Sequence, residues 1–139
     1  MRFFASLMAT AGVVLTLGIA SSAAHADGDA KAGAKVFAQC KACHQLEAGK
    51  KGIGPTLHGL FARPAGTVEG FQYSADMKAA GEKGLVWDEA TFLAYIADPK
   101  KYIGSRIGKA SANTKMVFVG LKNEKQRQDL LSYLKDATK

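Results

Sequence analysis

The two cysteines of the chain lie two residues apart and are followed directly by a histidine. The stretch reads QCKACHQ and contains Cys40, Cys43 and His44. Cysteine, two residues, cysteine and histidine is the attachment signature of a c-type haem. At the start of a helix the two sulfurs lie near one face, where each can form a thioether with a vinyl group of the porphyrin, and the adjacent imidazole can reach the iron. We therefore interpret this stretch as a covalent haem site.

Three other kinds of site use a cysteine pair, and each fits this chain less well. A disulfide across two residues closes a very small loop, which restrains the unfolded chain little. A thioredoxin-like dithiol is expected beside a β-α-β pattern, whereas this chain has patterns of helix and loop. A zinc site needs four ligands, and the only further histidine after the N-terminal segment is His58, at a spacing that no common zinc finger uses.

Haem iron takes two axial ligands, and His44 can supply only one of them. The candidates for the other are His58, Met77 and Met116, or the position stays open. A thioether favours Fe(II) and raises the reduction potential, a second imidazole lowers it, and an open position invites small ligands. Met77 lies in a short helical stretch, where methionine commonly fills the core. We favour Met116, because it follows a glycine-bearing loop that can wrap the far face of the ring.

Residues 1–26 have the layout of a secretory signal. Arg2 precedes an uncharged, partly apolar run, and Ala-His-Ala precedes Asp27, so we expect cleavage before Asp27. The alternative is a retained membrane anchor, although threonine, glycine and serine dilute the apolar run. Residues 27–139 then form one small domain. The formal net charge of the whole chain is +7, and its diffuse distribution suits an acidic protein surface and not nucleic acid.

Three amphipathic helices can be placed from capping residues and apolar spacing. Asp29, Asp88 and Asn123 are the expected N-caps, and Asp98-Pro99 ends the second helix. The connections between the helices are rich in glycine and hold no strand pattern for long. A chain this short buries a small fraction of its surface, so a large apolar cofactor would complete its core. We expect a mostly α, single-domain fold of three main helices, with long loops wrapped around one covalently attached haem.

Several motifs, taken in order, resemble one family over almost all of residues 27–139. They read GDAKAGAKVFAQCKACH, GIGPTLHGLFAR, GFQYS, VWDEATFLAYIADPKKYI, TKMVF and RQDLLSYLKDATK. On these motifs the chain resembles a class I cytochrome c, of the bacterial cytochrome c₂ type that is related to the mitochondrial carrier. The resemblance implies the cytochrome c fold and one covalently bound haem c.

The resemblance also implies a role for each matching residue. Cys40 and Cys43 match the positions of thioether attachment, and His44 and Met116 match the axial ligands of the iron. The further cofactor-binding positions are Pro55, Arg63, Tyr73, Trp87, Tyr95 and Thr114.

Some of these further positions have more specific expected contacts. The Pro55 carbonyl would accept a hydrogen bond from the second histidine nitrogen, which fixes the tautomer. Tyr95 would lie near the methionine sulfur. The haem propionates would be held by Arg63, Tyr73 and Trp87, because a buried carboxylate needs donors. The crossing of the terminal helices would use Gly33, Phe37, Leu130 and Tyr133.

The chain departs from the mitochondrial pattern at several positions. The segment between Ile103 and Met116 is longer, as is the segment before Trp87, which indicates the c₂ subgroup. Gly104 replaces a proline, so we expect the loop that leads to Met116 to open more easily. Met77 stands where the mitochondrial protein has a buried asparagine.

The resemblance implies a soluble periplasmic one-electron carrier and not an enzyme. Such a carrier would shuttle electrons from a cytochrome bc₁-type complex to a photosynthetic reaction centre or a terminal oxidase, as a monomer that binds no nucleic acid. The lysines that match the docking ring of the family are Lys35, Lys100, Lys101, Lys115 and Lys122. The rival interpretation is a haem enzyme or ligand sensor, such as a peroxidase or a nitric-oxide binder, with a labile sixth ligand.

Covalent attachment through Cys40 and Cys43 predicts that haem stays on the polypeptide during denaturing electrophoresis and acid-acetone extraction. A cofactor bound only by the folded state stabilises that state, so the double change Cys40→Ala and Cys43→Ala should leave a largely unfolded chain, as measured by circular dichroism. Complete extraction of haem from the wild type would contradict the covalent interpretation.

Overall fold

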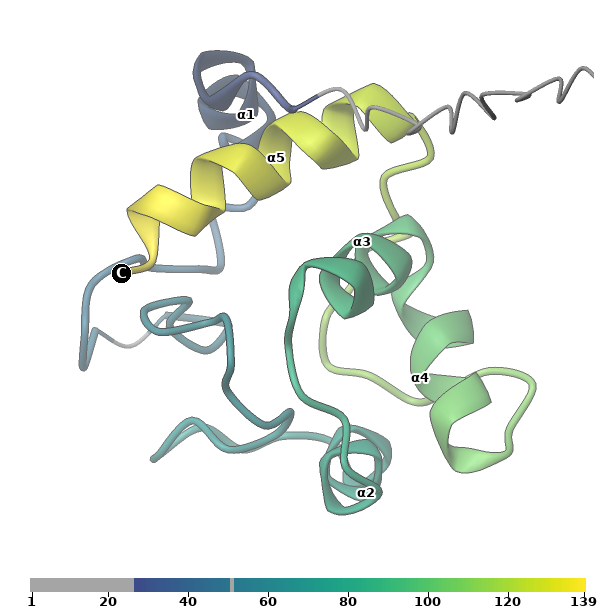
Figure 1. The fold of residues 1–139 in the computed structure, drawn as a ribbon. Coiled ribbons are helices and arrows are strands. Elements are labelled where there is room, and N and C mark those ends of the chain that lie inside the picture. The colour runs from purple at the N-terminus through teal and green to yellow at the C-terminus, as the bar shows by residue number, and fades with distance from the viewer. Residues whose placement is uncertain (1–26, 51) are drawn as a thin grey trace, which may run out of the picture.

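The computed structural model describes residues 27–50 and 52–139, and this part of the chain is helical. Figure 1 shows its five helices, which are α1 (Ala30–Phe37), α2 (Ala75–Glu82), α3 (Glu89–Ala97), α4 (Pro99–Ile107) and α5 (Glu124–Ala137). Within these described residues the backbone forms no strand, only an isolated antiparallel bridge between Pro64 and Val86. The expected mostly α fold is confirmed. The signal segment predicted for residues 1–26 lies outside the described residues.

The three predicted helices begin at the predicted caps. The side chains of Asp29 and Asn123 accept hydrogen bonds from backbone N–H groups in the first turns of α1 and α5. At α3, the Asp88 carboxylate accepts from Thr91 N–H (2.7 Å) and the Thr91 hydroxyl accepts from Asp88 N–H (2.8 Å). This reciprocal pair is a closed capping box, which satisfies two backbone donors that the helix leaves unpaired.

The expectation of three main helices is incomplete, because α2 and α4 are also formed. Asp98-Pro99 ends α3 as predicted, but it also begins α4: the Asp98 carboxylate accepts from Lys101 N–H (3.2 Å) and Pro99 lies in the first turn. Gly108, with φ of 78°, ends α4 in the left-handed conformation that glycine adopts without strain. The first turn of α2 is capped by the Ser74 hydroxyl.

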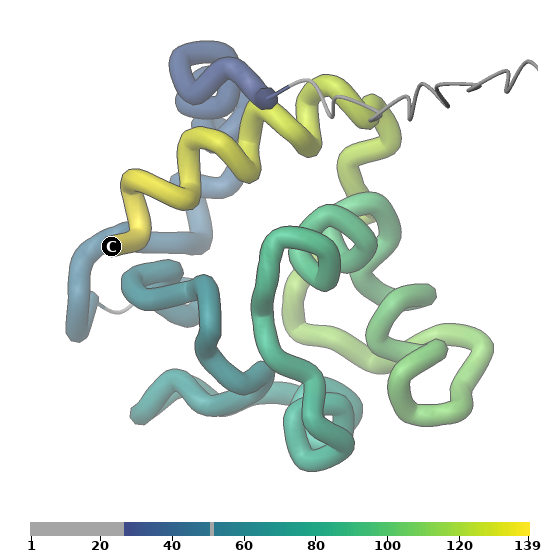
Figure 2. Tube along the Cα trace, viewed as in Figure 1, coloured from purple at the N-terminus to yellow at the C-terminus, as the bar shows by residue number. Residues whose placement is uncertain are grey.

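The first and last helices cross in close contact, and Figure 2 shows α5 passing beside α1. Gly33 lies at the crossing, where a β-carbon would overlap the Asp129 carbonyl group and lie 2.7 Å from Tyr133 Cβ. The rings of Phe37 and Tyr133 pack beside it with centroids 5.4 Å apart. The Asp129 carboxylate accepts a hydrogen bond from Asp29 N–H (2.7 Å), which ties α5 to the start of α1. The predicted packing of the terminal helices is confirmed.

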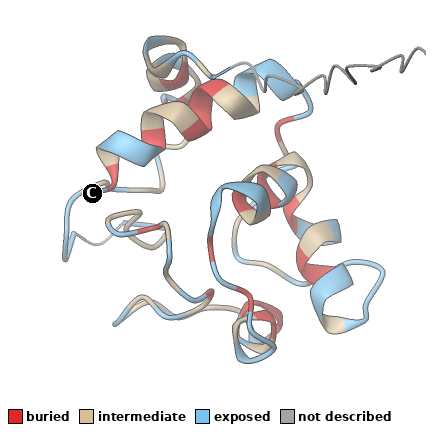
Figure 3. Ribbon diagram, viewed as in Figure 1, coloured by how far each residue is buried: buried red, intermediate tan, exposed pale blue. Residues whose placement is uncertain are grey.

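The buried residues follow the inner faces of the helices, as the red segments in Figure 3 show. The largest fully buried side chains are Phe37, Leu85, Pro99, Ile103, Leu130 and Leu134. The described loop residues between α1 and α2 contribute only Leu60 and Ala65 to the buried hydrophobic core. That side of the molecule is therefore thinly packed by the polypeptide itself. None of the helices in the described residues is long and apolar enough to cross a membrane.

The crossing geometry predicts that Gly33→Ala destabilises the fold. Helix propensity alone would favour alanine by about 1 kcal/mol, but a side chain forced into a filled contact costs about 1–3 kcal/mol. We expect the contact to dominate, because the neighbouring atom is a backbone carbonyl that cannot rotate away. Chemical denaturation of Gly33→Ala measures the change, with Ala34→Gly as the propensity control. A more stable Gly33→Ala protein would show that the helices do not touch here.

Candidate cofactor site

One cavity is lined by all ten residues that the sequence analysis singles out for cofactor binding and ligation. They come from distant parts of the chain: the turn after α1, the loop before α2, the short segment between α2 and α3, α3 itself, and the segment between α4 and α5. They are Cys40, Cys43, His44, Pro55, Arg63, Tyr73, Trp87, Tyr95, Thr114 and Met116. Met77 of α2 also lines the cavity. Of the five predicted docking lysines, Lys115 lines it as well. The structure thus brings the predicted set together around one space.

The cysteine pair is carried on turns that continue directly from α1. Cys40 N–H donates to the Phe37 carbonyl (2.8 Å), and His44 N–H donates to the Cys40 carbonyl (2.9 Å). Both cysteines are half-buried free thiols, so no disulfide joins them. Burial, and secondarily Cys43, raises the pKa of the Cys40 thiol, which disfavours the thiolate that a redox dithiol needs. No cluster of three or more candidate metal-binding His, Cys, Asp or Glu side chains occurs among residues 27–50 and 52–139.

The His44 ring is fixed from two sides. Its Nδ1 lies 2.8 Å from the Pro55 carbonyl oxygen. Because a carbonyl only accepts, Nδ1 must carry the proton, and Nε2 is the ring nitrogen available to a metal. Gly54 packs against the ring, and a β-carbon at that position would lie 2.7 Å from His44 Cε1. Sequence reasoning singled out Pro55 but not Gly54, since a glycine before a proline also occurs in ordinary turns.

Met116 is the methionine whose sulfur has a polar partner in the cavity. The Tyr95 hydroxyl donates to Met116 Sδ (3.1 Å), and the Thr114 hydroxyl donates to the Met116 carbonyl (3.2 Å). Burial raises the pKa of Tyr95 well above its ordinary value, so the hydroxyl keeps the proton that it donates. Met77 is buried among the hydrophobic side chains of the core. His58, the remaining candidate ligand, is not among the residues that line the cavity. Its backbone carbonyl accepts a hydrogen bond from Arg63.

Arg63 presents an unsatisfied donor next to the cavity. Its Nη1 donates to the His58 carbonyl (2.7 Å) and its Nη2 to the Thr56 carbonyl (3.1 Å), but the buried Nε has no hydrogen-bond partner among the described residues. Buried donors are nearly always paired in folded proteins, so this atom indicates an acceptor supplied by a bound group. Tyr73 and Trp87 line the same cavity, and burial raises the pKa of the Tyr73 hydroxyl. These three side chains fit an acidic group.

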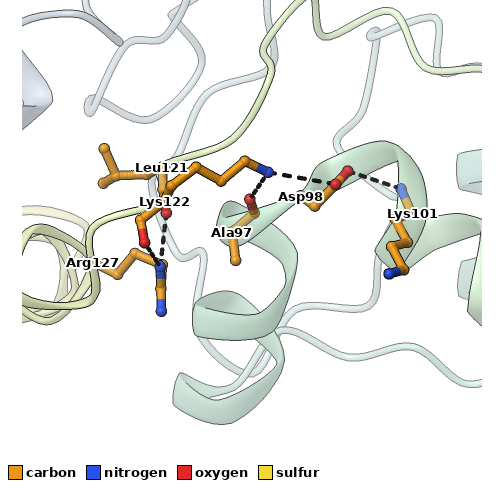
Figure 4. Close-up of polar contacts among 6 residues, drawn as sticks. All are labelled: Ala97, Asp98, Lys101, Leu121, Lys122 and Arg127. Carbon is orange, nitrogen blue, oxygen red and sulfur yellow. Dashed lines mark hydrogen bonds and ion pairs between the residues drawn. The ribbon is translucent and has the colours of Figure 1, made fainter.

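The five predicted docking lysines are all exposed. Lys35 lies on α1, Lys100 and Lys101 lie in the first turn of α4, and Lys115 lies at the cavity. Lys122 is engaged with the end of α3: its Nζ donates to the Ala97 carbonyl (2.7 Å) and lies 3.4 Å from the Asp98 carboxylate, as Figure 4 shows. Part of the Lys122 charge is therefore compensated within the chain.

Comparison with known proteins identifies the family. The cytochrome c family model matches residues 30–138. Cytochrome c of Stellaria longipes is 47% identical over 115 residues, which cover 81% of this chain and 96% of that protein. Cytochrome c2 of Blastochloris viridis is 42% identical over 123 residues, which cover 88% and 86%. The solved structure of cytochrome c2 from Rhodospirillum centenum matches with a TM-score of 0.74 at 39% identity, over 81% of this chain and 100% of that chain.

The chain belongs to the cytochrome c family. Within that family it is a cytochrome c₂-like electron carrier, and its structural neighbours confirm the predicted cytochrome c fold. Its cofactor is covalently bound haem c, as the family implies. The cavity suits this cofactor, because it offers two free thiols, a histidine with one nitrogen already bonded, a methionine sulfur, and a buried arginine donor that finds no acceptor in the described part of the chain.

Proposed function

We propose that this protein is a soluble periplasmic one-electron carrier whose haem c is attached at Cys40 and Cys43 and ligated by His44 and Met116. The observation that carries the proposal is that His44 and Met116 Sδ line one cavity, each held by a neighbouring group. Haem iron supplies one-electron chemistry between Fe(III) and Fe(II) when it is bound.

The residues around the two proposed ligands keep the site the same in both oxidation states. The Pro55 carbonyl holds the His44 ring, and the Tyr95 hydroxyl holds the Met116 sulfur. A neutral thioether favours Fe(II) and therefore a high reduction potential. If His44 and Met116 both ligated the iron, a substrate would find no vacant coordination site, which supports a carrier and not an enzyme.

The other predicted residues have supporting roles in this proposal. Arg63, Tyr73 and Trp87 would hold the haem propionates, and a propionate carboxylate would accept from Arg63 Nε, which is unpaired among the described residues. Thr114 bonds the Met116 carbonyl and so restrains the backbone beside the sulfur.

We propose that the protein is exported, that residues 1–26 are removed as a signal, and that residues 27–139 form the mature domain. Its donor would be a cytochrome bc₁-type complex, and its acceptor a reaction centre or a terminal oxidase. Docking would use Lys35, Lys100, Lys101, Lys115 and Lys122. The first four of these have no intramolecular ion pair within the described residues, so their charges are available to an acidic partner surface.

The proposed ligand set predicts distinct outcomes at the two methionines that line the cavity. Met116→His should keep a low-spin haem but lower the reduction potential, because imidazole replaces the thioether that favours Fe(II). Met77→Leu should leave the near-infrared band between iron and methionine sulfur intact, because Met77 serves as core packing. Redox potentiometry and absorption spectra measure both. If the band disappeared in Met77→Leu but survived in Met116→Leu, the ligand assignment would be wrong.

The docking proposal predicts a position-dependent effect of charge. The double change Lys100→Glu and Lys101→Glu should slow the second-order reaction with a purified bc₁-type complex about tenfold at low ionic strength, because summed charge steers the encounter. The loss should shrink as the Debye length falls to about 8 Å near physiological ionic strength. Stopped-flow kinetics across a salt series measures it.

The matched control is Lys78→Glu with Lys83→Glu, which makes the same charge change at α2. Both of these lysines are exposed, and neither belongs to the predicted ring. The control pair should slow the reaction much less. Equal slowing by the two pairs would mean that net charge alone matters and that no lysine ring exists.

A further inference from the structure

The segment after α4 folds back along that helix before it reaches Met116. Lys109 N–H donates to the Gly104 carbonyl (2.8 Å), and Ala112 N–H donates to the Lys100 carbonyl (3.0 Å). Gly104 is buried, and a β-carbon there would lie 2.7 Å from the Lys109 carbonyl oxygen. The structure thus gives Gly104 a packing role, because the missing side chain lets the loop pack onto α4. Easier opening of the loop stays a prediction.

The segment after α4 is also attached to α2. The Asp76 carboxylate accepts hydrogen bonds from Lys109 Nζ (2.6 Å) and from Asn113 N–H (2.7 Å). Asp76 is buried, and an unpaired charge in that position would be costly. The Lys109 hydrogen bond, followed by that of Asn113, lowers the pKa of Asp76, so the carboxylate is ionised and its hydrogen bonds are charge-assisted. Lys109 itself is half-exposed, so solvent weakens its share of this contact.

The other end of the segment (residues 109–122, called the Met116 segment below) is fastened to α3 and α5. Leu121 N–H donates to the Ile96 carbonyl (2.7 Å). Lys122 reaches the carbonyl of Ala97, and Arg127 Nη1 donates to the carbonyls of Leu121 (2.9 Å) and Lys122 (2.8 Å), as Figure 4 shows. Between the two fastened ends lies the stretch that contains Met116.

The middle of the Met116 segment lines the cavity, and only Met116 and Phe118 of this stretch pack against the core. Val117 is 100% exposed and Val119 is 85% exposed, and Met116 and Phe118 are only half-buried. How far this stretch can leave the cavity therefore depends on how much chain is free between the fastened ends, because a longer free loop has more open conformations.

We propose that Asp76 is a positioning residue for Met116, because it holds residues 109–113 on α2 and so limits the opening of the Met116 segment. This inference rests on the proposed function, in which Met116 is a ligand of the iron. It gives a role to a buried carboxylate that is not among the residues lining the cavity.

The test is competition by imidazole for the ferric holoprotein, followed by loss of the near-infrared band between iron and methionine sulfur. Asp76→Asn and Asp76→Ala should raise the apparent affinity for imidazole about tenfold, the size expected when a hydrogen bond to a charged group is lost. Lys109→Gln should have a smaller effect, since the Asn113 N–H bond remains.

A second readout does not depend on the iron. Hydrogen exchange of the Ala112 and Asn113 amides should become about tenfold faster in the Asp76 variants, while the amides of α5 keep their wild-type rates. The matched control is Asp136→Asn, which removes the same charge from an exposed pair with Lys139. The control should leave both readouts unchanged.

The outcomes separate the two claims. If the wild type lacked the near-infrared band between iron and methionine sulfur, the ligand assignment would be wrong, and this inference with it. A wild type with the band, in which the Asp76 variants bind imidazole no better than Asp136→Asn, would overturn the role of Asp76 alone. Faster exchange throughout α5 in the Asp76 variants would show a general loss of stability, which also overturns a specific positioning role.

Discussion

The polypeptide surrounds a cavity, so the loops that form its walls have to be held in place by contacts with the rest of the chain. The walls are long loops, and backbone hydrogen bonds join them to segments distant in sequence. These bonds connect Leu57 to Gln45, Gly59 to Thr138, Ala62 to Trp87, and Leu121 to Ile96. Because they join main-chain groups, they fix the loops without requiring particular side chains on the cavity side. Those side chains can then be chosen for the cofactor.

The two proposed ligands are held in different ways. His44 lies on turns that continue from α1, which α5 holds through the contact at Gly33, and the Pro55 carbonyl fixes its ring. Met116 lies on a loop and has the buried hydroxyl of Tyr95 as its partner. One proposed ligand therefore depends on helix packing, and the other on loop fastening. The Met116 side of the site therefore depends on hydrogen bonds of a loop, whereas the His44 side depends on the crossing of α1 and α5.

Local signals predicted the parts of the fold that depend on neighbouring residues. The caps at Asp29, Asp88 and Asn123 were readable because a cap acts within three residues. The missed helix α4 also had local signals, Asp98-Pro99 at its start and Gly108 at its end, but an aspartate-proline pair is compatible with both the end of one helix and the start of another.

The cavity was predictable only through the family resemblance, since its lining residues come from segments that no periodicity relates. Asp76 shows where both approaches fail. Its partners lie 33 and 37 residues away, in the segment after α4, and one of them is a backbone group. Every residue except proline has a backbone N–H, so the sequence does not show which of them will bond a carboxylate. A lysine near a glycine-rich loop is ordinarily solvated. Only the three-dimensional arrangement reveals the contact.

Asp98 ends α3 with its backbone N–H, begins α4 with its carboxylate, and faces the ammonium group of Lys122 from the end of the Met116 segment. One residue thus joins three chain segments at a single corner, which is visible at the centre of Figure 4. With so few free dihedral angles between them, the two helices and the attached end of the segment should move as one rigid body on the microsecond timescale. Thermal fluctuations at this corner would then be collective, and a slow relaxation detected in α3 should share its rate constant with one detected at Lys122.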